Sequence, residues 1–187
     1  MSKVRFGLKN VHYAVLSETE SGGVVSYSWG TPVAVNGAVS LALDESGDIN
    51  NFYADNIVYY SSKGATSYSG DLEVAKVPDS MLKDIFGYAE DSTSKVLVKS
   101  AQSTAVRFAL LYQIDGDADN ELYVMYNCTA TAPNAGSATI TETTEPQTQS
   151  MTITAVPLPD GSVFARTTSE TTAAVKNAWF ESVWRAS

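Results

Sequence analysis

The 187-residue sequence is poor in the side chains on which most enzyme and metal chemistry depends. It contains one cysteine, Cys128, and one histidine, His12. A single cysteine excludes an internal disulfide framework and a cysteine-rich zinc site, and a single histidine leaves little for a catalytic triad. His12 lies in an alternating apolar run and Cys128 follows another, so we assign both to structural roles. The sequence predicts no enzyme activity, no metal site and no cofactor.

Positive charge is also scarce. The chain has 12 Lys and Arg against 21 Asp and Glu, a net charge of -9, and residues 41–91 alone contribute -7. This balance argues against a surface that holds a polyanion such as DNA. No apolar run approaches the roughly 18 residues of a membrane span, and the first residues lack the apolar core of a signal peptide. We expect a protein made in the cytosol, without a membrane segment or specific nucleic-acid binding.

One acidic cluster resembles a calcium-binding loop at first sight. It consists of carboxylates at alternate positions, namely Asp115, Asp117, Asp119 and Glu121. An EF-hand loop needs Gly at its sixth position and Glu at its twelfth, where this chain has Asn120 and Tyr126. We interpret the cluster as a polar hairpin turn that needs no divalent ion.

Alternating apolar and polar residues dominate the chain and predict β-strands. The alternating runs are 11–16, 25–29, 33–35, 39–43, 106–114, 122–126, 151–153 and 163–166. The first two predict an antiparallel pair, and 106–114 with 122–126 predict a hairpin. Asn36-Gly37 fits either a tight turn or a bend in a longer strand. The predicted class is mainly β, with two packed antiparallel sheets in a sandwich or barrel-like arrangement.

Two segments depart from this alternation and predict helices. Pro78 and Asp79 open a short helix near 78–87, which Gly87 terminates. Ser169 can cap a C-terminal helix near 170–185 whose apolar stripe covers one face of a sheet. Nothing divides the apolar blocks into two units, so we expect a single domain over 1–187.

Residues 44–70 form an acidic, tyrosine-rich stretch between the predicted strands and the first helix. It is too long for a passive connection in a compact domain. Aromatic side chains on a polar loop indicate protein contact. A plain solvated hairpin is the alternative interpretation of this stretch.

Three parts of the sequence resemble the major tail proteins of long-tailed bacteriophages, which build the tail tube. They are KVRFGLKNVHYA, GTPVAVNGAVSLALDESGD and NFYADNIVYYSSKGATSYSGDLEVAKVPDSMLKDIFG. The order and spacing of these elements also match, from the basic start through the acidic turn to the short helix. The resemblance covers about the first half of the chain.

The resemblance implies a structural virion protein that forms hexameric rings, stacked into a hollow tube for DNA delivery. Strands of neighbouring subunits would join in an inner barrel, for which residues 24–43 are the candidates, and a long loop would reach the adjacent ring. The candidates for that loop contact are Phe52, Tyr53, Asp55, Tyr59 and Tyr60, and those for the lumen are Asp44, Glu45 and Asp48. Implied partners are further copies of the chain and the tail tip, tape measure and terminator proteins. DNA would pass without specific binding, and the protein would reside in the virion after synthesis in the host cytoplasm.

Two other functions fit parts of the sequence. A carbohydrate-binding β-sandwich module of an adhesin would also be acidic and tyrosine-rich, but would be a compact monomer with an aromatic platform or a cation site. A tube protein of a contractile system shares the stacked rings but should also contact an external sheath. No residues in the sequence identify a sheath contact.

Overall fold

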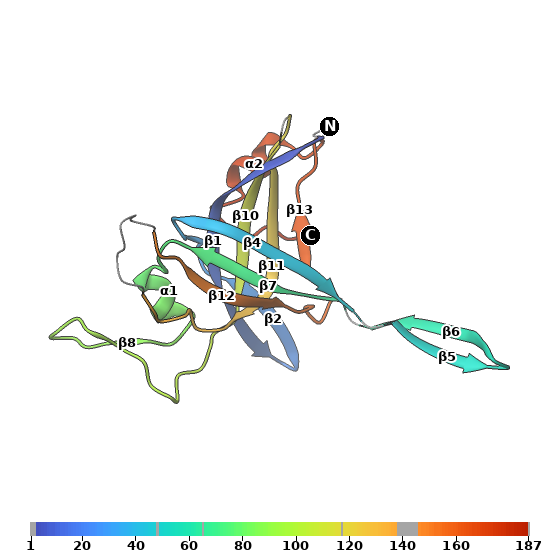
Figure 1. The fold of residues 1–187 in the computed structure, drawn as a ribbon, viewed down its shortest axis with the longest axis horizontal. Coiled ribbons are helices and arrows are strands. Elements are labelled where there is room, and N and C mark those ends of the chain that lie inside the picture. The colour runs from blue at the N-terminus through green and yellow to red at the C-terminus, as the bar shows by residue number, and fades with distance from the viewer. Residues whose placement is uncertain (1–2, 48, 65, 117, 138–145, 187) are drawn as a thin grey trace.

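The computed structural model describes residues 3–47, 49–64, 66–116, 118–137 and 146–186, and these are mainly β-strand (Figure 1). The strands are β1 (Arg5–Ser21), β2 (Val24–Trp29), β3 (Val33–Ala34), β4 (Ala38–Ser46), β5 (Ile49–Ala54), β6 (Ile57–Lys63), β7 (Ser67–Val74), β8 (Ala89–Glu90), β9 (Leu97–Val98), β10 (Phe108–Gly116), β11 (Glu121–Ala130), β12 (Gln149–Ala155) and β13 (Phe164–Arg166). The helices are α1 (Asp79–Asp84) and α2 (Ala173–Ala178). The predicted mainly-β class is confirmed.

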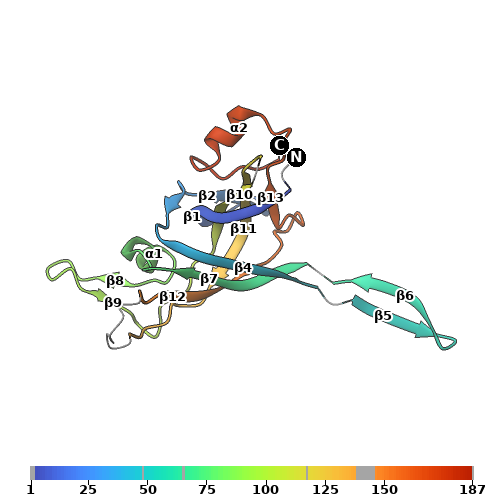
Figure 2. The same ribbon diagram turned by 45° about the horizontal axis from the view of Figure 1, so that its top comes forward.

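Nine strands form one antiparallel sheet in the order β2-β1-β10-β11-β12-β7-β4, with β13 added to β11 and β3 to β1. β11 links two halves of this sheet, because it pairs with β10 along most of its length and with β12 through Cys128, Thr129 and Ala130. Figure 2 shows β4 and β7 crossing the direction of β10 and β11. The structure therefore has two packed layers, as predicted, but these layers are the two halves of one bent sheet.

The main core lies between these halves. Its buried side chains come from β1, β7, β10, β11, β12 and α1, including Tyr13, Leu72, Leu110, Ile153 and Met81. Period-two alternation sends one set of side chains from each strand into this space. A second core covers the opposite face of β1, β10 and β11, where the C-terminal segment packs. The prediction that this segment covers a sheet face is confirmed.

Both predicted helices are present, although the second is shorter than predicted. α1 occupies the interval predicted for it, and Gly87, with a φ of +66°, follows its final turn. α2 begins after Thr172 rather than Ser169 and ends at Ala178 instead of reaching 185. The chain then places Trp179 in the second core, where its indole N–H donates to the Tyr123 carbonyl at 3.2 Å. The helix therefore ends where Trp179 binds to the sheet, before the predicted end at residue 185.

The predicted strand pairs are also present. β2 pairs antiparallel with β1 from Leu16 opposite Trp29 onward, and β10 and β11 form the predicted hairpin. Asn36-Gly37 joins β3, which pairs with β1, to β4, which pairs with β7. The turn therefore carries the chain from one half of the sheet to the other.

β4 and β7 approach each other closely at Gly70. A β-carbon on Gly70 would lie 1.8 Å from the Ala42 carbonyl oxygen, so only glycine fits this position. The two strands stay paired as far as Ser46, which lies opposite Ser67. In the part of the chain that the structure describes, no helix has the length and apolar character needed to cross a membrane.

Candidate functional site

The stretch predicted as a long loop at 44–70 contains a β-hairpin that projects from the body. β4 continues to Ser46, β5 and β6 form a separate two-stranded sheet, and β7 resumes at Ser67. Figures 1 and 2 show the hairpin extending beyond the ends of β4 and β7 without a covering element. The loop assignment is thus corrected to a hairpin, which was the alternative interpretation.

The tip of this hairpin is a two-residue turn. Ala54 lies opposite Ile57, and the turn residues Asp55 and Asn56 have φ angles of +51° and +62°. Two consecutive positive φ angles define a type I′ turn, whose twist matches that of the flanking strands. Asp and Asn tolerate this conformation better than other residues with a side chain. The local sequence therefore favours a tight, straight hairpin.

Large apolar side chains of the hairpin face solvent. Tyr53, Ile57, Val58, Tyr59 and Tyr60 are between 48% and 70% exposed. The register places Phe52 opposite Tyr60. Of the predicted loop contacts, Tyr53, Asp55, Tyr59 and Tyr60 are exposed on one short projection.

Both faces of the hairpin carry these side chains. Tyr53 and Val58 are register partners and share one face, whereas Ile57 and Tyr60 share the other. Tyr59 lies at the register shift between them. An isolated two-stranded hairpin is at best marginally stable in water. Burial of its faces against a partner would stabilise it, and contiguous exposed apolar surface is typical of protein contact sites.

A second surface is the polar sheet face, the outer side of β4, β7 and β12. Strand register aligns three rows of side chains there, and its members are Ser40, Ala42, Asp44, Ser69, Asp71, Glu73, Ser150, Thr152 and Thr154. Leu72 and Ile153 point from the same strands into the core. None of the three strands contains Lys or Arg. This face therefore carries acidic and small polar groups without a basic residue in its strands.

Hydrogen bonds order the polar sheet face. The Thr152 hydroxyl donates to Asp71 at 2.7 Å, and the Ser40 hydroxyl donates to Glu73 at 3.1 Å. The hydroxyls of Ser69 and Thr154 lie 3.3 Å apart. These bonds hold the carboxylates of neighbouring strands in fixed positions along the sheet.

The strand register places the predicted lumen residues on different sides of the sheet. Asp44 belongs to the polar sheet face. Glu45 is the next residue and points to the opposite side, where its carboxylate accepts from the Tyr68 hydroxyl at 3.4 Å. Asp48 lies outside the described residues. Asp71 and Glu73 were not among the predicted lumen residues, although the alternation in Ser69-Gly-Asp-Leu-Glu-Val74 indicates a strand that places them on one face.

The two ends of the large sheet are open. Within the described residues, β2 pairs with β1 alone and β4 pairs with β7 alone. The candidate inner-barrel interval 24–43 thus contributes strands to both extremes of the sheet instead of two neighbouring strands. An exposed strand edge presents unpaired backbone groups to another chain.

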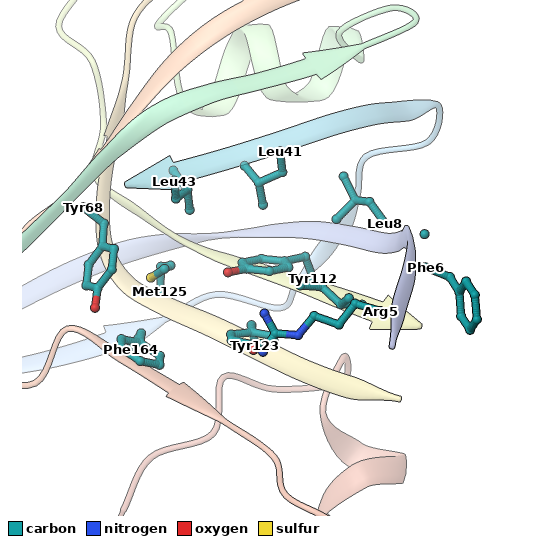
Figure 3. A pocket seen from close by; sticks show the side chains of 12 residues that line it. Arg5, Phe6, Leu8, Leu41, Leu43, Tyr68, Tyr112, Tyr123, Met125 and Phe164 are labelled. Atoms are coloured by element: carbon teal, nitrogen blue, oxygen red, sulfur yellow. Dashed lines mark hydrogen bonds between the residues drawn. The ribbon is translucent and has the colours of Figure 1, made fainter. Parts of the chain in front are cut away.

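A pocket of about 360 Å³ opens between β1, β4 and β13 (Figure 3). Its walls are apolar and aromatic, with Leu41, Leu43, Met125 and Phe164 among them. Tyr112 and Tyr123 stack at a centroid distance of 5.0 Å beneath it. The pocket therefore has an aromatic floor between strands of the two halves of the sheet.

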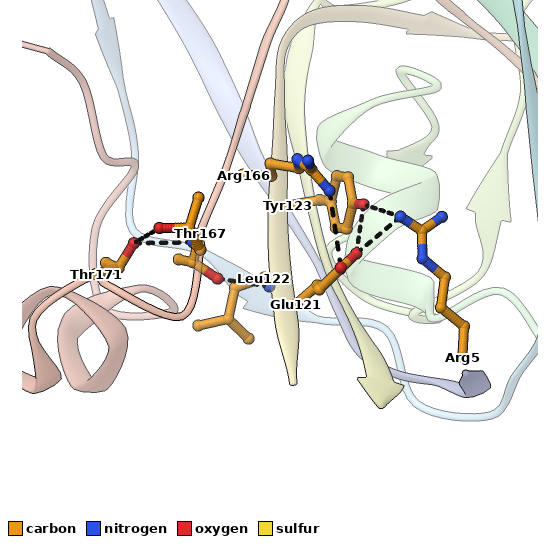
Figure 4. Close-up of polar contacts among 8 residues, drawn as sticks. Arg5, Glu121, Leu122, Tyr123, Arg166, Thr167 and Thr171 are labelled. Atoms are coloured by element: carbon orange, nitrogen blue, oxygen red, sulfur yellow. Dashed lines mark hydrogen bonds and ion pairs between the residues drawn. The ribbon is translucent and has the colours of Figure 1, made fainter. Parts of the chain in front are cut away.

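Arg5 and Tyr123, which line this pocket, belong to a network of polar contacts (Figure 4). Glu121 lies 3.0 Å from Arg5 and 3.7 Å from Arg166, and the Tyr123 hydroxyl donates to it at 2.7 Å. Burial, followed by the hydrogen bond to Glu121, raises the pKa of Tyr123. The Thr167 hydroxyl accepts from the Leu122 amide at 3.0 Å. The network joins β1, β11 and β13, so it stabilises this end of the sheet.

The structure also shows the surroundings of the residues that were weighed as catalytic or metal-binding candidates. The His12 ring stacks on Phe180 at 4.8 Å, and burial raises the pKa of the Cys128 thiol to about 12. Asp115 lies 2.5 Å from the Lys9 ammonium, whose hydrogen bond holds the pKa of that carboxyl below its usual value. Asp117 lies outside the described residues. Among the described residues, no three or more His, Cys, Asp and Glu side chains cluster as metal ligands.

Comparison of the sequence with protein-family models and with curated proteins finds no match. The projecting hairpin, the polar sheet face and the open sheet edges are therefore the features that bear on function.

Proposed function

We propose that this chain is a tail tube protein of a long-tailed bacteriophage, which assembles into stacked rings that deliver the genome. The observation that carries the proposal is the projecting β5–β6 hairpin with exposed apolar side chains on both faces. Such an element adds little to the stability of its own domain. It supplies a contact that another copy of the chain, in an adjacent ring, can bury.

The open edges of the large sheet support the formation of rings. β2 and β4 lie at opposite extremes of the strand order. Pairing of one edge with the other edge of a neighbour is a heterologous contact, and repetition of such a contact closes a ring when the rotation permits. The same pairing satisfies the unpaired backbone groups of both strands.

The polar sheet face supports a DNA-conducting role. Asp44, Asp71 and Glu73 are surrounded by hydroxyl-bearing side chains in strands without basic residues. Each basic contact to a phosphate would release counterions and add binding, whereas an acidic wall repels the DNA. We assign this face to the lumen. The tail tip, tape measure and terminator proteins are then the further partners of the tube.

Replacement of residues 50–62 by a short Gly/Ser linker tests the proposal. The variant should keep the wild-type circular dichroism of the sheet body and its thermal midpoint, because the two buried cores draw no described residue from the hairpin. Negative-stain microscopy should show tubes for the wild-type chain, with an initiating tail tip supplied, and none for the variant. Tubes of normal length from the variant would contradict the proposal, as would a wild-type chain that stays monomeric under every assembly condition.

A further inference from the structure

A second projection lies at the other end of the molecule. The β8–β9 arm, residues 89–98, forms its own two-stranded sheet with Ala89 opposite Val98. Figures 1 and 2 place this arm and the β5–β6 hairpin at opposite ends of the longest axis. Its strands have two residues each, which is too short for a period-two signal, so the sequence did not predict the arm.

Local polar contacts fix the shape of the arm. Asp91 accepts hydrogen bonds from the backbone and hydroxyl of Ser94 at 2.6 and 2.7 Å, which lower the pKa of its carboxyl. Glu90 lies 2.9 Å from Lys83 and 3.3 Å from Lys95. Lys95 has a φ of +60° at the return of the chain. The arm is thus preorganised by its own side chains.

This fixed arm presents an apolar pair between basic residues. Val96 and Val98 are 56% and 54% exposed and, by strand alternation, share one face. Lys95 and Lys99 lie immediately before and after them. The Lys99 ammonium lies 5.0 Å from the Tyr88 ring centroid, close to the body. By the same alternation Lys95 and Lys99 start from the opposite face, so the strip Lys-Val-Leu-Val-Lys has exposed β-branched side chains on one face and long basic side chains flanking them from the other.

The β5–β6 hairpin has the complementary chemistry. Asp55 is the only charged residue within 49–62, and it occupies the tip of the hairpin. Ile57, Val58 and Tyr59 follow it with exposed apolar side chains. Contact between aromatic and β-branched side chains on adjacent strands is favourable, and the acidic tip would meet Lys95 or Lys99.

We propose that the β8–β9 arm is the receptor for the β5–β6 hairpin of a second copy of this chain. This inference rests on the proposed function, because it names the surface on which the hairpin of the adjacent ring docks. Donor and receptor lie at opposite ends of the molecule, so the contact is head-to-tail. A head-to-tail contact between unlike surfaces leaves one donor and one receptor free after each addition, and it therefore propagates into a polymer.

The rim of the apolar pocket is a weaker candidate for the same role. Arg5 is the charged residue in its lining, and it is already paired with Glu121 at 3.0 Å. An incoming Asp55 would have to compete with that carboxylate, as it would with Glu90 at Lys95. At Lys99 the described contacts are with the aromatic rings of Phe86 and Tyr88, so no carboxylate has to be displaced there. The pocket is therefore the alternative receptor that the experiment must separate from the arm.

A mixing experiment tests the inference with two assembly-deficient variants. The receptor variant carries Val96→Ser and Val98→Ser, and the donor variant has residues 50–62 replaced by a Gly/Ser linker. Neither should form tubes alone, and each should keep its thermal midpoint because the changed residues are exposed or outside the cores. Mixed together they should form two-ring stacks, because the receptor variant still supplies a hairpin and the donor variant still supplies an arm.

The outcomes separate the two proposals. Tubes from the donor variant would contradict the proposed function itself. Loss of tubes in the donor variant together with normal tubes from the receptor variant would overturn only the arm as receptor and direct attention to the pocket. Absence of two-ring stacks in the mixture would also overturn it, provided that both variants fold by circular dichroism.

A charge-reversal series gives a second test that needs no apolar substitution. Lys99→Glu should raise the critical concentration for tube assembly by about tenfold, and Asp55→Lys in the same chain should restore most of the loss. Lys176→Glu on α2 is the matched control, because it changes the net charge equally and lies outside the arm. An equal effect of Lys99→Glu and Lys176→Glu, or no rescue by Asp55→Lys, would overturn the inference.

Discussion

The chain contains two tyrosine-rich hairpins whose side chains have opposite environments. In β10–β11, Tyr112 and Tyr123 are buried register partners that stack on each other within the body. In β5–β6, Tyr59 and Tyr60 are largely exposed, and the hairpin extends into solvent. The two hairpins use similar residues and the same antiparallel pairing.

The comparison shows that residue type alone does not determine burial. β11 is covered on one face by β12, β7 and α1 and on the other by the C-terminal segment. In the part of the chain that the structure describes, no element covers β5–β6, and this hairpin has apolar residues on both faces. A sequence that keeps this composition on an uncovered hairpin is consistent with burial in an assembly.

The same substitution, Val to Ala, made in each hairpin gives the largest expected difference in the free energy of unfolding. Val124→Ala in β11 removes two buried methyl groups and should lower the free energy of unfolding by about 2 to 3 kcal/mol. Val58→Ala in β6 should change it by less than about 0.5 kcal/mol, because Val58 is exposed in the single chain. Urea unfolding of the unassembled protein measures both. Comparable losses would mean that the hairpin packs on its own domain.

Hydrogen exchange provides the next contrast. Backbone amides of β10–β11 should be protected in both the free chain and the tube, since the core covers them. Amides of β5–β6 should exchange rapidly in the free chain and slow by about a hundredfold in the tube, where a partner covers both faces. Mass spectrometry of peptic peptides from both states reports this change. Equal protection of β5–β6 in the two states would remove the hairpin from the assembly contact.

The fold was predictable where local alternation coincided with burial on one face. Tyr13, Leu110 and Ile153 lie in runs whose apolar members point into the core, and their strands were predicted. The hairpin at 49–63 was not predicted as the preferred structure, because both of its faces carry apolar residues and the register shift at Tyr59 interrupts the alternation. The Asp55-Asn56 turn was the remaining local signal.

The polar sheet face could not be predicted in full, because it depends on pairing between strands that are distant in the sequence. Asp44 was selected because it follows an alternating run, but its neighbours Asp71 and Glu73 join it through pairing of β4 with β7. That pairing joins strands on either side of the hairpin and includes the close approach at Gly70, which no local pattern encodes. Similarly, the C-terminal helix was predicted too long because the Trp179 anchor on Tyr123 depends on the folded body.

Alkaline unfolding probes the buried tyrosines of β10–β11. Burial raises the pKa of Tyr112 above its ordinary value of 10.0, so its contribution to stability is complete below that pH and is lost as the pH rises toward the folded value. Tyr112→Phe keeps the ring that stacks on Tyr123 and removes the ionisable group. The variant should therefore lose less stability than the wild-type chain between about pH 9 and 11. A parallel decline in both proteins would contradict this role of Tyr112.

The smallest expected effect concerns the turn at the tip of β5–β6. Substitutions there test whether the stability of the hairpin is independent of the stability of the body. Asn56 has a φ of +62°, which glycine adopts at no steric cost and alanine adopts poorly. Asn56→Gly should stabilise the type I′ turn by a few tenths of a kcal/mol and slow exchange of the hairpin amides in the free chain by about twofold. Asn56→Ala is the matched control and should accelerate the same exchange. Neither change should move the thermal midpoint, because Asn56 is exposed at the tip of the hairpin. A midpoint shift in either variant would show that the turn is coupled to the body, and the independence of the two hairpins would then be wrong.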